Sequence, residues 1–139
     1  MDKVDPFRGS WIFRPALSKM STPGPRRWVQ TIECEGDAVS VREEIDFGEG
    51  HATTIGIEAK FNGKSYTVSG SPAADAMAYT RLDNQTIFGT ASRQGIVTIQ
   101  ETLVVTEDGQ RMTMKYMVFR GKKKVARGIA MFERMGICR

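Results

Sequence analysis

The sequence predicts an all-β fold: an antiparallel up-and-down β-barrel of about 8–10 strands, with a short N-terminal coil or helical turn. Runs of Val, Ile, Thr, Tyr and Phe, which fit a pleated sheet, alternate with turn signals at nearly regular intervals. These signals are rich in Gly, Asn and Asp, which suit tight hairpins, and lie at 35–37, 48–50, 62–63, 83–84, 93–95, 107–109 and 120–121. A long twisted meander tends to close, and a barrel of this size encloses space for a ligand.

The individual elements follow from local patterns. A first strand is expected at 8–13, and Pro15, Pro23 and Pro25 exclude a regular ladder from the coil at 14–25. One helical turn at 16–20 is expected to cover an end of the barrel. Period-two alternation then predicts nine further strands, at 26–34, 38–46, 51–61, 64–69, 76–82, 85–92, 96–106, 110–119 and 124–134. Residues 70–75 are expected to form a loop.

Composition indicates one globular domain spanning residues 1–139, with 40% hydrophobic and 26% charged residues. No apolar run approaches the ~20 residues of a membrane-spanning helix, so no membrane span is expected. The first six residues lack the apolar stretch of a signal peptide, which favours a cytoplasmic location.

Cysteine, histidine and charge patterns exclude several functions. Cys34 and Cys138 are too few for a disulfide framework, and His51 is the only histidine, so we expect no metal and no cofactor. The net charge is +4, with basic residues concentrated at 120–127. No aromatic residue lies among them, so we expect a solvated hairpin turn and no nucleic-acid partner. Weak attraction of anions or membrane surfaces is the alternative.

Five segments resemble, in register, the sequences of bacterial lipocalin-like proteins. They are GSWIF at 9–13, PALSK at 15–19, FNGKSYTVSG at 61–70 with Pro72 and Asp75, RLD at 81–83, and VVTEDGQRMT at 104–113. The resemblance implies an antiparallel barrel of the calycin type. It implies little about activity.

Alternation within each strand predicts which side chains face the interior. The inward phase is rich in Met and aromatic residues, and the candidate ligand-binding residues are Trp28, Met77, Arg81, Met112, Met114 and Tyr116. Because Met adapts to irregular shapes, such a lining suits a pliable apolar ligand, although plain filling of the core is the alternative for each Met. Trp11 is expected to plug the closed end of the barrel.

Two glutamates fall in the same inward phase. Glu43 lies among Val39, Val41 and Ile45, and Glu101 occupies the equivalent phase of 96–106. An ionised carboxylate on an apolar face is costly unless it is paired, and Arg81 is the expected partner. One interpretation is a buried Glu–Arg network, or a strand-end residue that reaches solvent. The other is a polar anchor, or a general acid or base, in an apolar pocket.

Three functional hypotheses follow. The first is binding of a small, largely apolar molecule inside the barrel. The second is a calycin-type enzyme, such as an isomerase, a cyclase or a pericyclase-like catalyst, with Glu43, Glu101 and Tyr79 as catalytic residues. The third is a structural or dimerisation module. The sequence leaves open whether the chain is a monomer or a homodimer.

Overall fold

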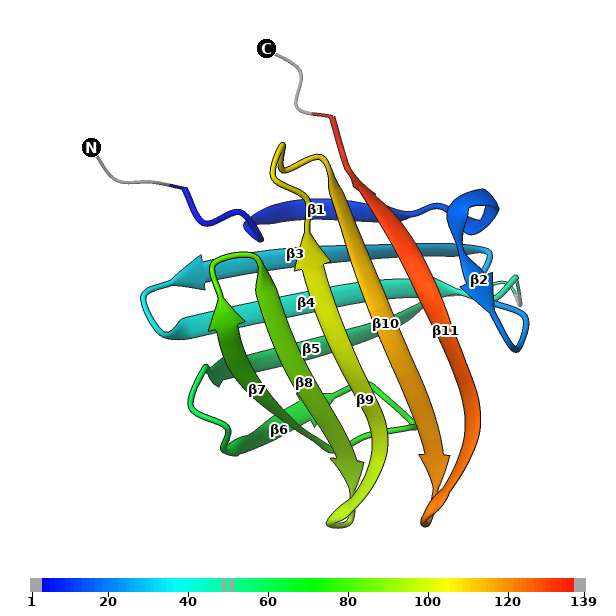
Figure 1. Ribbon diagram of the computed structural model, residues 1–139. Coiled ribbons are helices and arrows are strands. Elements are labelled where there is room, and N and C mark those ends of the chain that lie inside the picture. The colour runs from blue at the N-terminus through cyan, green and yellow to red at the C-terminus, as the bar shows by residue number, and fades with distance from the viewer. Residues whose placement is uncertain (1–3, 49, 51, 137–139) are drawn as a thin grey trace.

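The computed structural model describes residues 4–48, 50 and 52–136 (Figure 1). It confirms the predicted fold class, because the chain forms a closed, antiparallel, up-and-down β-barrel. His51 and Cys138 lie outside the described residues.

Eleven strands form one sheet, and the ten that were predicted lie within two residues of their expected bounds. The strands are β1 (Gly9–Phe13), β2 (Lys19–Met20), β3 (Arg27–Glu35), β4 (Ala38–Asp46), β5 (Thr53–Lys60), β6 (Ser65–Ser69), β7 (Ala76–Asp83), β8 (Thr86–Arg93), β9 (Ile96–Val105), β10 (Arg111–Arg120) and β11 (Lys123–Arg134). The expected helical turn is a 3-10 turn, η1 (Pro15–Leu17), and the two-residue strand β2 was not predicted.

The barrel closes through β1, a strand of five residues. From β3 to β11 each strand pairs with the next along the chain, and β1 pairs with both β3 and β11. In Figure 1, β1 and β3–β5 run across the view while β7–β11 run steeply across them, so the interior lies between two crossing faces. The basic turn expected near residue 121 connects β10 to β11.

β1 is too short to cover the whole gap between β3 and β11. It pairs with β11 only at 132–134, and β2 pairs with β11 further along, at Gly128 and Ile129. Residues 22–25, which we call the 22–25 segment, then cross to β3. Backbone hydrogen bonds flank this segment: Ser21 donates to the carbonyl of Arg127, and Arg26 donates to the carbonyl of Asp46.

Trp11 lies in the packed core, as the sequence predicts. It is 0% exposed, and its indole N–H donates to the carbonyl oxygen of Phe7 at 3.0 Å. The guanidinium of Arg134 lies 4.3 Å from the centre of the Trp11 ring and donates to the carbonyl oxygens of Pro6 and Arg8. Trp11 and Arg134 therefore attach the N-terminal segment to β1 and β11.

Candidate functional site

The interior holds a cavity of about 340 Å³, within the range of about 300–1,000 Å³ that is usual for small-molecule sites. Its walls come from strands on both faces of the barrel, and the 22–25 segment and the 71–74 loop also line it. Most lining side chains are apolar, among them Ile55, Ile57 and Val68. Phe47, which is 58% exposed, also lines the cavity and marks its rim.

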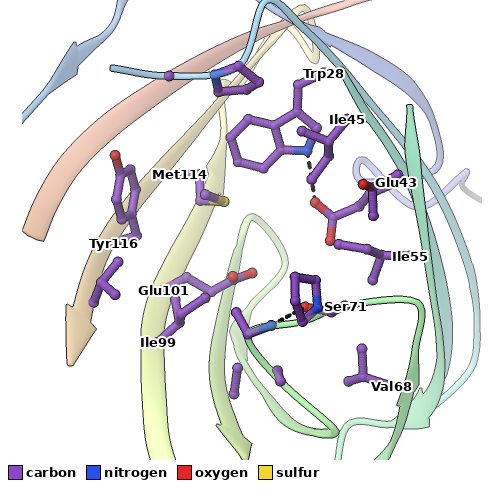
Figure 2. A pocket seen from close by; sticks show the side chains of 18 of the residues that line it. Trp28, Glu43, Ile45, Ile55, Val68, Ser71, Ile99, Glu101, Met114 and Tyr116 are labelled. Atoms are coloured by element: carbon purple, nitrogen blue, oxygen red, sulfur yellow. Dashed lines mark hydrogen bonds between the residues drawn. The ribbon is translucent and has the colours of Figure 1, made fainter. Parts of the chain in front are cut away.

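Glu43 extends into this cavity from β4. One of its carboxylate oxygens accepts a hydrogen bond of 2.8 Å from the indole N–H of Trp28 on the neighbouring strand β3 (Figure 2). Burial raises the pKa of Glu43, and the Trp28 hydrogen bond partly opposes that rise because it favours the charged carboxylate. Glu43 is half-buried, and it lines the cavity.

Glu101 extends into the cavity from β9 on the facing wall (Figure 2). Within the described part of the chain it forms no ion pair, and no hydrogen bond contributes to its pKa. Burial, followed by the negative charge of Glu43, raises the pKa of Glu101 to about 8. Most Glu101 side chains are therefore protonated at neutral pH.

Two glycines inside strands make room for the polar side chains of the cavity wall. Glu101 pairs with Gly89 on β8 and with Tyr116 on β10, and Tyr116 pairs with Gly128 on β11. A Cβ atom at Gly128 would lie 2.5 Å from the Tyr116 hydroxyl oxygen. A Cβ atom at Gly89 would lie 3.2 Å from Cγ of Glu101 and 3.1 Å from the Tyr79 ring. Both glycines thus allow large side chains to cross neighbouring strands.

Several candidate residues from the sequence gather at this cavity. Its lining includes Trp28, Glu43, Met77, Glu101, Met114 and Tyr116. Burial raises the pKa of Tyr116, whose hydroxyl lies over Gly128.

Two other candidates are buried without lining the cavity. Met112 is fully buried, so it fills the core. Tyr79 is 2% exposed, and burial, followed by the charges of Glu101 and Glu43, raises its pKa well above the ordinary tyrosine value.

Arg81 lies elsewhere, and the expected Glu–Arg network is wrong. Its guanidinium forms a two-point ion pair with Asp5, with Nη1–Oδ2 and Nη2–Oδ1 distances of 2.6 and 3.1 Å. It also lies over the rings of Phe7 and Phe61. Arg81 is near the end of β7, where the N-terminal segment supplies a closer carboxylate, so it neither lines the cavity nor neutralises the inward glutamates.

Sequence reasoning missed three parts of the cavity wall: Met20 of β2, the 22–25 segment and the 71–74 loop. Their signal was weak, because alternation assigns faces only inside strands. Gly89 and Gly128 carried a usable signal, since a glycine inside a strand often marks close approach by another group.

The described residues contain no group of three or more His, Cys, Asp or Glu side chains that could hold a metal ion. Among the same residues, no helix has the length and apolar character needed to cross a membrane.

No protein family and no curated protein matches the sequence. The fold is similar to that in the crystal structure of Rv2717c from M. tuberculosis, with a TM-score of 0.57 over 94% of each chain and 11% sequence identity. The two proteins share a barrel fold. This likeness agrees with a calycin-like barrel at a coarse level, whereas the lipocalin-like resemblance has no support from a family match.

Proposed function

We propose that this barrel binds a small, largely apolar molecule in its interior. The proposal is carried by the cavity of about 340 Å³, which has mainly apolar walls and two carboxyl groups. Moving apolar ligand surface from water into such a space is favourable by about 25 cal/mol per Å² of surface buried. The polar groups of the wall fix the orientation of the ligand.

The methionines support the same proposal. Met20, Met77 and Met114 line the cavity, while Met112 is packed in the core. A flexible thioether can adapt to ligands of different shape. A barrel that served only as a structural module would have no need for this lining, so the cavity favours binding over the structural hypothesis.

A large side chain inside the cavity is expected to weaken binding. Ile99 lines the cavity from β9, so Ile99→Trp fills part of it, whereas Val104→Trp places the same indole on the exposed outer face of the same strand. Native mass spectrometry of freshly purified protein is expected to show a retained small molecule in the wild type and in Val104→Trp. Titration calorimetry with the neutral probe 1-naphthylmethanol is expected to show at least about tenfold weaker binding to Ile99→Trp.

Equal affinity of the wild type and Ile99→Trp for this probe would contradict binding in the cavity. Circular dichroism of both variants serves as the control for folding. An indole at position 99 can strain the core by about 1–3 kcal/mol without unfolding it.

Acid/base catalysis is the second candidate function. It is favoured by Glu101, whose pKa of about 8 keeps a proton available near neutral pH, opposite a second carboxyl group in an apolar space. Glu101 and Glu43 would then act as the acid and base, with Tyr116 as the neighbouring hydroxyl. Tyr79 would act only through its packing beside Glu101, since it does not line the cavity.

Deuterium exchange into 2-tetralone, an apolar ketone with acidic C–H bonds, tests this second function. The enzyme hypothesis expects exchange above the buffer rate, falling about 10²–10⁴-fold in Glu101→Gln and Glu43→Gln. The matched control is Glu58→Gln, which changes an exposed glutamate on β5. Equal rates for the wild type and both inward variants would leave binding as the function.

A further inference from the structure

The acidic groups of the cavity have no basic partner among its described lining residues. Among its described lining residues there is no Lys, Arg or His, yet Glu43 and Glu101 both extend into it. The five ion pairs that the structure shows involve neither glutamate. The chain as a whole carries a net charge of +4, yet the described lining of the cavity has acidic groups and no basic one.

Hydrogen bonds within the described chain occupy only some of the carboxyl oxygens of Glu43 and Glu101. The indole N–H of Trp28 occupies one oxygen of Glu43, and no side-chain donor occupies Glu101 in the described residues. Figure 2 shows the two carboxyl groups pointing into the same space from facing walls. Buried carboxylates require a cation or several donors, and this cavity has room for a ligand to supply them.

Aromatic rings lie beside the same space. Trp28 and Tyr116 line the cavity, Trp28 next to Glu43 and Tyr116 next to Glu101 in the strand register. The face of an aromatic ring attracts a positively charged nitrogen, most strongly where water is excluded. Carboxyl groups and aromatic rings together are the usual surroundings of a bound ammonium group.

We propose that the ligand of this cavity is a hydrophobic amine: a compact apolar body whose protonated nitrogen lies between the carboxyl groups of Glu43 and Glu101. This inference rests on the proposed binding function and names the chemical class of the ligand. An anionic ligand, such as a fatty acid, would bring a negative charge beside two acidic groups, and the described lining residues supply no cation to balance it. A neutral ligand would occupy the apolar walls and leave Glu101 in its protonated form.

The proposal has a distinct pH signature. A bound ammonium group favours the ionised carboxylate, so amine binding displaces the proton that Glu101 holds at neutral pH. The other titratable groups close to it are Glu43, Tyr116 and Tyr79, and burial raises the pKa of both tyrosines above the ordinary tyrosine value. Amine affinity is therefore expected to increase from about pH 6 to about pH 8, whereas the affinity for a neutral ligand stays nearly constant.

Three probes with one apolar body provide the test: 1-naphthylmethylamine, 1-naphthylmethanol and 1-naphthoate, titrated by calorimetry at about pH 6 and about pH 8. The amine is expected to bind at least about tenfold more tightly than the alcohol at the higher pH, and the carboxylate most weakly. The double variant Glu43→Gln with Glu101→Gln is expected to lose this preference, so that it binds the amine no more tightly than the alcohol. Glu58→Gln, on the outer face of β5, is expected to behave as the wild type.

The outcomes separate this inference from the function on which it rests. If the alcohol binds as tightly as the amine, or if the double variant keeps the preference for the amine, the amine proposal is overturned and apolar binding stands. If none of the three probes binds to the folded wild type, the proposed function is overturned together with it.

Discussion

Trp11→Ala is expected to lower the free energy of unfolding by about 3–5 kcal/mol, the usual cost of removing a large aromatic side chain from a core. Trp11 is fully buried, so its removal leaves a void that neighbouring strands fill only partly. The change also removes the hydrogen bond to the Phe7 carbonyl and the ring beneath the Arg134 guanidinium. Urea unfolding followed by far-UV circular dichroism measures the loss.

Two further variants make this measurement decisive. Leu82→Ala, at a site on β7 that is 59% exposed, is expected to change stability by less than about 0.5 kcal/mol. Trp11→Phe, which keeps an aromatic ring but loses the donor, is expected to fall between the wild type and Trp11→Ala. A loss below about 1 kcal/mol in Trp11→Ala would show that the packing around β1 does not depend on this side chain.

Glu101→Gln is expected to remove most of the decline in stability between about pH 5 and pH 8. The pKa of Glu101 is about 8 in the folded protein and near the ordinary value of 4.5 in the unfolded chain. The folded state therefore binds more protons than the unfolded state in this interval, so the free energy of unfolding falls as the pH rises through it. The effect is on the order of 2–4 kcal/mol, because Glu101 is only half-buried and the penalty on its charged form is reduced accordingly.

Urea unfolding at several pH values measures this effect. The wild type is expected to approach Glu101→Gln in stability at about pH 5 and to fall below it at about pH 8. Glu58→Gln controls for the loss of one acidic group, since Glu58 is exposed on β5. Parallel curves for the wild type and Glu101→Gln would mean that Glu101 is not held in an apolar space.

The strands and their inward faces could be predicted because both depend on local sequence. Alternation of apolar and polar residues identifies a strand and its two faces, so Glu43 and Glu101 were expected inside, where the structure places them. The turn residues identify the hairpins for a similar reason, since positive φ is a local requirement. Gly36, Gly63, Gly95, Gly109 and Gly121 all have positive φ.

Position along the barrel axis could not be predicted in the same way. Alternation places Arg81 on a face of β7, but it does not tell which segment lies opposite, and Asp5 is 76 residues away in the chain. Alternation also puts Met112 and Met114, two residues apart on one strand, on the same face. It does not tell that Met112 is packed in the core whereas Met114 lines the cavity. The location in the cell stays a prediction from the N-terminal residues, and the sequence leaves open the choice between monomer and homodimer.

The 22–25 segment lines the cavity without belonging to a strand, unlike most of the wall. Pro23 and Pro25 have no N–H to donate, and the backbone hydrogen bonds that hold this part of the chain come from Ser21 and Arg26 on either side. Side-chain packing holds it in place of strand pairing, because Pro25 is buried and a Cβ atom at Gly24 would lie 2.9 Å from the sulfur of Met20.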